Sequence, residues 1–276
     1  MSTITRFAPS PTGYLHLGHA AAALIAWTRA RQAGGRFLLR IEDLDPARCR
    51  PAFTTALMED LIWLGLDWDG PPRLQSAHLP DYQAALDQLA ARNLLYPCFC
   101  TRSAIAREIA AAPHSPDGGP LYPGTCRALS PAARAARIAA GAPYALRLDM
   151  NQARAIAGPL RYHEEAAGWC PCAPQRFGDV ILARKDVPAS YHLCVTHDDA
   201  LQGVTLVTRG EDLRPATDLH RLLQALFGWP APAYAHHPLL TGPNGKRLAK
   251  RDGAASLRSL RASGASPDQV RALIRA

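Results

Sequence analysis

The sequence predicts an α/β fold built on a parallel sheet, with a subdomain inserted between the two halves of that sheet. A short apolar strand at 4–8, a helix-forming stretch at 18–32 and a second apolar strand at 37–41 follow one another near the N-terminus. That order is typical of a βαβ unit, in which the two strands are parallel. Between about 98 and 159 the composition changes to alanine, proline and glycine with scattered charges, and this change indicates the insert.

Each element has its own local signal. Prolines and a glycine at 9–13 place a loop after the first strand, and Gly34-Gly35 ends the helix. Apolar residues at helical spacing then predict amphipathic helices at 57–66 and 82–95. The later elements are strands at 180–183 and 204–208, a helix at 217–227, a proline-rich segment at 230–243 and a short helix in the last eleven residues.

Size and charge narrow the class of protein. With 276 residues, the chain can bury one large core, or one core with small inserts. It has 31 Lys and Arg against 23 Asp and Glu, and the net charge of +8 favours a polyanionic partner. No apolar run is long enough to span a bilayer, and Arg6 interrupts the N-terminus too early for a secretory signal. We therefore expect a cytoplasmic protein that does not associate with membranes.

The cysteines favour a metal site. A cytosolic chain rarely forms disulfides, so a tight cysteine cluster points to metal binding. Cys98, Cys100 and Cys126 would supply three thiolates, and one more ligand would complete a tetrahedral structural zinc site. Chemistry alone favours His114 as the fourth ligand, since tyrosine is an uncommon one. A second cysteine pair, at 170–172, has no evident partners and is left outside the site.

Five short segments, taken in order along the chain, resemble the signature sequences of one enzyme family. They are RFAPSPTG at 6–13, HLGH at 16–19, RIEDLDP at 40–46, TRGEDL at 208–213 and KRLAKRDG at 246–253. The second and the fifth are similar to the two ATP motifs of class I aminoacyl-tRNA synthetases, and the others to the glutamyl and glutaminyl branch. Two short matches alone are weak, but five in family order are specific. The resemblance covers essentially the whole chain and implies the Rossmann-like catalytic fold of that class.

The resemblance implies ATP chemistry. In this family an amino-acid carboxylate attacks the α-phosphorus of ATP, which binds with Mg²⁺, so the protein must position reactants and stabilise charge. His16 and His19 stand at a helix N-terminus, where N–H groups can donate to phosphate oxygens, and Gly18 allows the adenine or ribose to approach closely. Alone, either histidine would more simply cap the helix. In the second motif Lys250 would contact the leaving pyrophosphate, and Arg247 keeps a positive charge where the family usually has lysine.

A pocket for glutamate needs a fixed cation for a carboxylate and a carboxylate for the ammonium. Arg6 offers a planar fork suited to a carboxylate, and Glu42 can hold the ammonium. Both lie at the carboxyl ends of predicted parallel strands, where open α/β sheets bind ligands. The resemblance adds four residues to the glutamate site: Ala8, Ser10, Tyr191 and Arg209.

The resemblance also changes the expected metal site. Short glutamyl-synthetase relatives have a tyrosine four residues before the last cysteine of the cluster, which here is Tyr122. We therefore expect Tyr122 as the fourth zinc ligand, with His114 as the rival.

The length of the printed sequence suggests the substrate. It ends about two dozen residues after the second motif, whereas a complete glutamyl-tRNA synthetase has a further helical domain that reads the anticodon. The short form resembles a bacterial branch of the family that activates glutamate without tRNA and attaches it to queuosine in the anticodon loop of tRNA(Asp). The expected partners are ATP, L-glutamate and the anticodon stem-loop of tRNA(Asp), bound by a monomer. Two alternatives stay open: a truncated glutamyl-tRNA synthetase that charges a tRNA 3′ end, and a non-catalytic RNA-binding relative.

The expected division of the chain follows from the motifs. Segments 1–97 and 161–230 would form the two halves of the catalytic domain, and 98–160 the zinc-binding insert that in the larger enzymes handles the acceptor end. Segment 231–276 would carry the second-motif loop and a short helical end, with no anticodon-binding domain.

Overall fold

The computed structural model describes residues 2–101, 115–116, 118, 121–184, 186–240 and 256–275. Three of the residues that the sequence singles out, His114, Arg247 and Lys250, lie outside these ranges. Within them, no helix is both long enough and apolar enough to cross a lipid bilayer.

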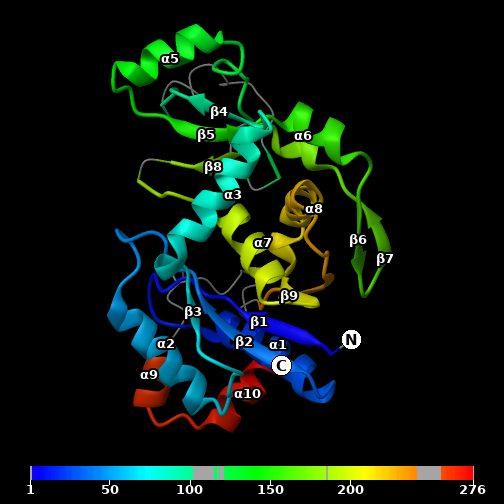
Figure 1. Ribbon diagram of the computed structural model, residues 1–276. Coiled ribbons are helices and arrows are strands. Elements are labelled where there is room, and N and C mark those ends of the chain that lie inside the picture. Colours follow the sequence, from blue (N-terminus) through cyan, green and yellow to red (C-terminus); the bar gives the residue numbers. More distant parts are fainter. Residues whose placement is uncertain are drawn as a thin grey trace.

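A parallel sheet forms the base of the molecule (Figure 1). The strand β1 (Ile4–Phe7) pairs in parallel with β2 (Arg36–Ile41), which pairs in parallel with β3 (Arg73–Leu74). On the other side of β1, the Thr205 N–H donates to the Ile4 carbonyl at 3.0 Å and links this sheet to a second one. There β9 (Leu206–Gly210) pairs in parallel with β10 (Ala233–His237), and β10 in parallel with β6 (Arg161–Glu164). A hairpin partner, β7 (Gly168–Pro171), runs antiparallel to β6. The predicted parallel α/β architecture is confirmed.

Small side chains let the helix α1 (Leu17–Gln32) lie close to this sheet. Its alanines face inward, and the Thr5 hydroxyl donates to the Ala26 carbonyl at 2.7 Å. After the helix the chain must pass tightly beneath β1, since a Cβ on Gly35 would lie 2.0 Å from the Thr3 carbonyl oxygen. Only glycine fits there, so Gly34-Gly35 fixes the helix-to-strand connection that the sequence predicts.

Three further helices cover the lower face: α2 (Pro51–Trp63), α9 (Leu257–Ala262) and α10 (Pro267–Arg275). Leu257 and Val270 are fully buried and pack with α1 and α2 in one apolar cluster. Helix α2 begins six residues before the predicted start at residue 57, because Pro51 stands in its first turn, where a missing N–H costs nothing. It ends before Gly65, which adopts a φ of 71°.

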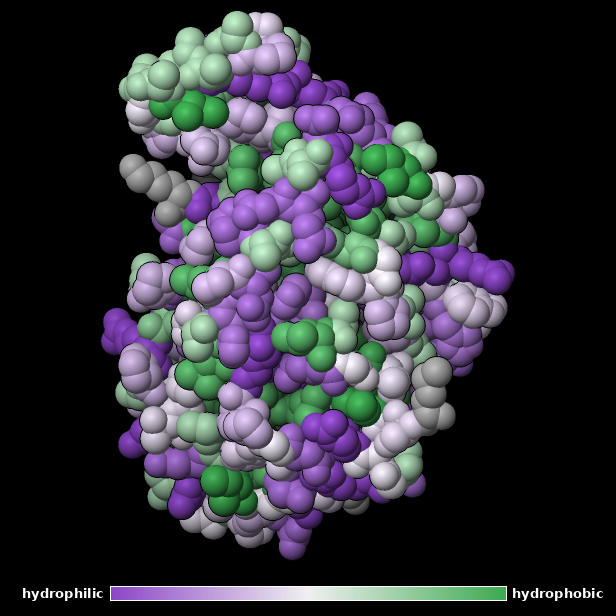
Figure 2. Space-filling model, viewed as in Figure 1, coloured by the Kyte–Doolittle hydropathy of each residue, from purple (hydrophilic) through white to green (hydrophobic). Residues whose placement is uncertain are grey.

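A third sheet, which is antiparallel, forms the insert at the top of Figure 1. Its strands are β4 (Leu95–Cys98), β5 (Ala145–Leu148) and β8 (Ile181–Ala183), and its helices are α5 (Pro131–Ala139) and α6 (Met150–Ala157). No residue of α5 is buried, and its alanines give a mildly hydrophobic outer surface (Figure 2). The strand predicted at 180–183 is present as β8. It lies in segment 161–230, which the sequence predicts to belong to the catalytic half, but it pairs with β5 of the insert.

The helix α3 (Leu79–Ala91) ends earlier than the predicted segment 82–95. Asn93 takes a left-handed φ of 57°, which ends the helix, and Leu95 already begins β4. Leu94 is fully buried, so the apolar spacing continues through a change from helix to strand.

Two helices fill the centre of the molecule between the sheets: α7 (Tyr191–Leu201) and α8 (Ala216–Phe227). Three short 3₁₀ helices complete the described elements: η1 (Gln75–His78), η2 (Pro174–Phe177) and η3 (Glu211–Leu213). The N-terminal ends of α1 and α7 and the carboxyl ends of β1, β2, β9 and β10 all meet at one cavity, described next.

Candidate active site

A cavity of about 500 Å³ opens at this junction. Every ATP or glutamate residue that the sequence predicts, and that the structure describes, lines it: Arg6, Ala8, Ser10, His16, Gly18, His19, Glu42, Tyr191 and Arg209. These residues come from segments that are up to about two hundred positions apart in the sequence. The structure therefore brings the predicted set together in one hollow.

The two histidines cap helix α1 and also line the cavity. His16 Nδ1 accepts from the Gly18 N–H at 3.1 Å, and His19 Nδ1 accepts from the His16 N–H at 3.3 Å. Their ring centroids lie 3.8 Å apart. Because each Nδ1 accepts a hydrogen bond, the proton of each neutral ring is on Nε2. The histidines therefore cap the helix and also line the cavity, and capping leaves Nε2–H as the ring group that can donate to a ligand.

Arg6 and Arg40 share one carboxylate beneath the cavity. Arg6 Nε donates to Asp199 Oδ1 at 3.0 Å, and Arg40 NH1 donates to the same oxygen at 2.8 Å. Arg6 NH1 also donates to the Thr208 carbonyl at 3.2 Å. Burial alone would raise the pKa of Asp199, but the two arginines outweigh it and hold that pKa below its usual value. Arg6 is therefore a fixed cation whose charge is partly balanced.

Glu42 is a buried carboxylate that is incompletely satisfied. It follows β2 directly, and its side chain is 9% exposed, with Arg40 NH2 at 3.7 Å from Oε1. Among the residues that the structure describes, Glu42 Oε1 has no hydrogen-bond partner. Burial raises the pKa of Glu42 to about 7, against the opposing attraction of Arg40 and Arg6. A cation that donates hydrogen bonds, such as an ammonium, would satisfy this oxygen.

Arg209 is held by three partners at the end of β9. Its Nε donates to His236 Nε2 at 3.2 Å, NH1 to His220 Nδ1 at 3.1 Å and NH2 to the Thr217 hydroxyl at 2.7 Å. Burial, and after it the positive charge of Arg209, lowers the pKa of both histidines, and the pKa of His236 falls to about 4. Both imidazoles are therefore neutral, and all three partners of Arg209 are uncharged acceptors. Unlike Arg6, Arg209 thus makes these three hydrogen bonds to uncharged groups and not to a carboxylate.

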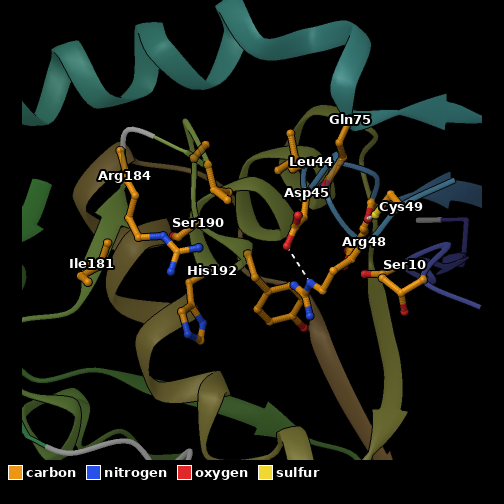
Figure 3. A pocket seen from close by; sticks show the side chains of 16 residues that line it. Ser10, Leu44, Asp45, Arg48, Cys49, Gln75, Ile181, Arg184, Ser190 and His192 are labelled. Carbon is orange, nitrogen blue, oxygen red and sulfur yellow. Dashed lines mark hydrogen bonds and ion pairs between the residues drawn. The ribbon is translucent and has the colours of Figure 1, made fainter. Parts of the chain in front are cut away.

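A second cavity of about 340 Å³ adjoins the first (Figure 3). The two cavities share four lining residues: Ser10, Thr12, Glu42 and Tyr191. Arg48, which pairs with Asp45 at 2.6 Å, reaches in from the loop after β2. Arg184 reaches in from the opposite wall, beside Ser190 at the start of α7. The arrangement offers cations, a carboxylate and a hydroxyl around a space open to the first cavity.

Three cysteine thiols of the insert lie together. The sulfurs of Cys98, Cys100 and Cys126 all lie within 4.8 Å of one another. The distance between the Cys100 and Cys126 sulfurs is 3.5 Å. The Tyr122 hydroxyl lies 3.5 Å from the Cys100 sulfur and accepts from the Cys126 N–H at 2.8 Å. Sulfurs bound tetrahedrally at zinc–sulfur distances of about 2.3 Å are about 3.8 Å apart, so these residues fit a metal ion. The second cysteine pair, Cys170 and Cys172, belongs to no such cluster in the described part of the chain.

Several residues that shape the site were not predicted from the sequence. They are the partners of Arg6 and Arg209, together with the carboxylate bonded to His236: Asp199, Thr217, His220, His236 and Glu164. Asp199 belongs to the HDD sequence that follows Tyr191 on the same helix, and two adjacent carboxylates on a mostly buried helix were a usable signal. The sequence does not single out the other four, because their roles depend on contacts between elements that are distant in the sequence.

Residues 2–275 match the family model described as tRNA synthetases class I (E and Q), catalytic domain. A Glutamyl-Q tRNA(Asp) synthetase from Rhodobacter capsulatus is 50% identical over 98% of this chain and 99% of the relative. A protein of the same name from Symbiobacterium thermophilum is 47% identical, covering 96% of this chain and 83% of the relative.

Among solved structures, a glutamate tRNA ligase from Elizabethkingia meningosepticum in complex with its amino acid superposes with a TM-score of 0.77. It is 32% identical, and the match covers 92% of this chain and 53% of that one. The chain therefore belongs to the class I glutamyl- and glutaminyl-tRNA synthetase family. It is a ligase of the aminoacyl-tRNA synthetase type.

Proposed function

We propose that this enzyme activates L-glutamate with ATP in the absence of tRNA and transfers it to queuosine in the anticodon loop of tRNA(Asp). The observation that carries the activation step is the convergence of both ATP-side histidines and two arginines with Glu42 on one cavity. The transfer step is supported by the names and the 44–50% identity of four of its relatives.

The charges of the cavity suit glutamate. Glu42 would hold the substrate ammonium through its unsatisfied oxygen, while Arg6 and Arg209 would hold carboxylates. Tyr191, Ala8 and Ser10 would shape the space between these charges. Because the partners are fixed by the fold, the substrate need not organise them on binding.

ATP, with Mg²⁺, would occupy the part of the cavity at the N-terminus of α1. The Nε2–H groups of His16 and His19 and the helix end would face the phosphates, and Gly18 would leave room for the nucleoside. Lys250 and Arg247, which are outside the described residues, would approach from the second motif, whose flanking Leu240 also lines the cavity.

The second cavity would receive the nucleoside that accepts glutamate. It opens onto the first beside Glu42 and Tyr191, so an acceptor hydroxyl there could reach the activated carboxyl group. Arg48 and Arg184 would contact phosphate or ribose oxygens.

The cysteine cluster would hold one structural zinc ion, with Cys98, Cys100, Cys126 and Tyr122 as ligands. Support comes from the sulfur spacing and from the Tyr122 hydroxyl at 3.5 Å from Cys100. A structural ion there would stabilise the insert and leave the chemistry to the catalytic cavity. The enzyme would act as a monomer in the cytoplasm, where its tRNA substrate is found.

The activation step is tested by glutamate-dependent exchange between pyrophosphate and ATP with no tRNA added. We expect exchange with glutamate, and kcat/KM lower by roughly 100-fold or more with glutamine or aspartate, because an unfilled charged contact is costly in a buried site. Glutamine lacks the charge that the arginines pair, and aspartate is one methylene short. No exchange with pure protein, glutamate and Mg²⁺ would contradict the proposal.

The acceptor is tested with tRNA(Asp) whose 3′-terminal ribose has been oxidised with periodate under conditions that spare queuosine. Transfer should persist, since a base-modifying enzyme does not need the terminal hydroxyls. It should also occur on the isolated queuosine stem-loop and weaken steeply with salt, as phosphate contacts do. Charging of intact tRNA(Glu), with no transfer to the stem-loop, would instead support the truncated-synthetase alternative.

A further inference from the structure

Arg209 is tied into a chain of hydrogen bonds that crosses three neighbouring strands. His236 on β10 lies directly opposite Arg209 on β9 in the parallel register. His236 Nδ1 is 2.6 Å from Glu164 Oε2, and Glu164 comes from β6 on the far side of β10. The side chains of His236 and Glu164 are each only 2% exposed. The chain therefore runs from the cavity into the interior of the sheet.

The direction of each hydrogen bond in this chain is fixed. A guanidinium has no acceptor, so Arg209 Nε must donate, and His236 Nε2 must be the unprotonated nitrogen. The proton of His236 is then on Nδ1 and is donated to Glu164 Oε2. The other oxygen, Oε1, accepts from the His236 backbone N–H at 3.0 Å. Both oxygens of Glu164 are thus acceptors for the same residue.

Only a carboxylate meets this requirement. An amide at position 164 has one oxygen and one NH₂ group, so it would present N–H to N–H at one of the two contacts. If the NH₂ group faced His236 Nδ1, the ring would have to carry its proton on Nε2, facing the Arg209 Nε–H. Glu164 therefore selects the histidine tautomer that can accept from Arg209.

We propose that Glu164 and His236 are positioning residues for Arg209, which they hold so that its remaining N–H groups face the substrate carboxylate. The Thr217 hydroxyl and His220 Nδ1 bind the other two nitrogens, and with His236 they use three of the five N–H groups. The role rests on the proposed function, because it assumes that Arg209 binds glutamate. Neither Glu164 nor His236 would touch the substrate.

The test compares variants in the pyrophosphate exchange assay, with KM for glutamate, KM for ATP and kcat measured separately. Glu164→Gln should raise KM for glutamate roughly tenfold, as expected for one lost hydrogen bond to a charged group, and change KM for ATP and kcat by less than about twofold. The matched control is Glu165→Gln, one residue along, where the carboxylate pairs instead with the half-exposed Arg29. This control should behave as wild type.

A second pair of variants separates positioning from folding. His236→Gln places an amide oxygen near the position of Nε2 and should largely preserve KM for glutamate, whereas His236→Asn reaches only toward Glu164 and should raise KM like Glu164→Gln. Unfolding temperatures of all variants are measured beside the kinetics, and the histidine pair decides the question if Glu164→Gln does not fold. Unchanged KM in Glu164→Gln, or equal KM in the two histidine variants, would overturn the positioning role. Absence of exchange by the wild type would instead overturn the proposed function.

Discussion

Replacing Glu42 with glutamine should stabilise the free enzyme at neutral pH and weaken its binding of glutamate. The carboxylate is buried and follows β2, and burial raises its pKa to about 7 from an ordinary 4.5. A carboxyl group with a raised pKa binds its proton more tightly in the folded state than in the unfolded state. The folded protein therefore loses stability as the pH rises from about 4.5 to about 7, and above that range the whole loss is present.

The size of the effect follows from the two pKa values. Their difference corresponds to about 3 kcal/mol of folding free energy. For a chain of this size, roughly 2 °C of Tm per kcal/mol gives an increase of about 6 °C for Glu42→Gln at pH 8. The increase should shrink as the pH falls toward 4.5, the ordinary pKa, and vanish below it, where the wild-type carboxyl becomes protonated in both states. The charge needed for the substrate ammonium is thus a cost to the free protein.

Thermal unfolding between pH 4.5 and pH 8, with and without glutamate, measures both effects. Glutamate should raise the Tm of the wild type but not that of Glu42→Gln, because the variant cannot pair with the ammonium. Glu59→Gln, on the exposed side of α2, is the matched control and should follow the wild type at each pH. If Glu42→Gln were less stable than the wild type at pH 8, Arg40 and Arg6 would stabilise the carboxylate more than burial destabilises it. The reasoning would then be wrong.

Three further results are expected. Cys126→Ser should release one zinc ion and lower Tm, and Tyr122→Phe should weaken zinc retention during dialysis against a chelator, since structural zinc supplies folding free energy; full retention by both would place the metal elsewhere. Lys250→Ala should lower kcat of exchange roughly 100-fold and change KM for glutamate little, because its contact grows as pyrophosphate leaves; an effect on KM for glutamate alone would contradict this role. Arg48→Ala should reduce transfer to tRNA roughly tenfold more than it reduces exchange; equal losses would assign Arg48 to activation.

Local elements of this fold could be predicted where short-range chemistry decides them. The first βαβ unit was predicted closely, because its alanine-rich helix and Gly34-Gly35 act within a few residues. The end of α3 could not be predicted, since buried Leu94 continues the apolar pattern past the turn at Asn93. The partner of β8 could not be predicted either, because an apolar segment at 181–183 suits either sheet and only the tertiary fold chooses.

The same distinction applies to the site. Arg6 and Glu42 could be proposed from the sequence because each lies at the carboxyl end of a strand, at the edge of the sheet where ligands bind. Their shared surroundings could not, since Asp199 is 193 residues from Arg6 and meets it only through the packing of α7 on the sheet. The sequence therefore predicts which groups could bind a substrate, while the structure determines how much of each charge is already balanced.

How much of each arginine's charge is already balanced by the protein affects which amino acid the enzyme would select. Arg6 shares its charge with Asp199, whereas Arg209 is surrounded by a hydroxyl and two neutral imidazoles. A neutral amide loses little at a cation that is already paired, but it leaves an unpaired buried cation at one that is not. Discrimination between glutamate and glutamine should therefore depend more on Arg209 than on Arg6. The uncharged groups bonded to Arg209 hold its position, and the Glu164 carboxylate is linked to it only through His236, so less of its charge is balanced than that of Arg6.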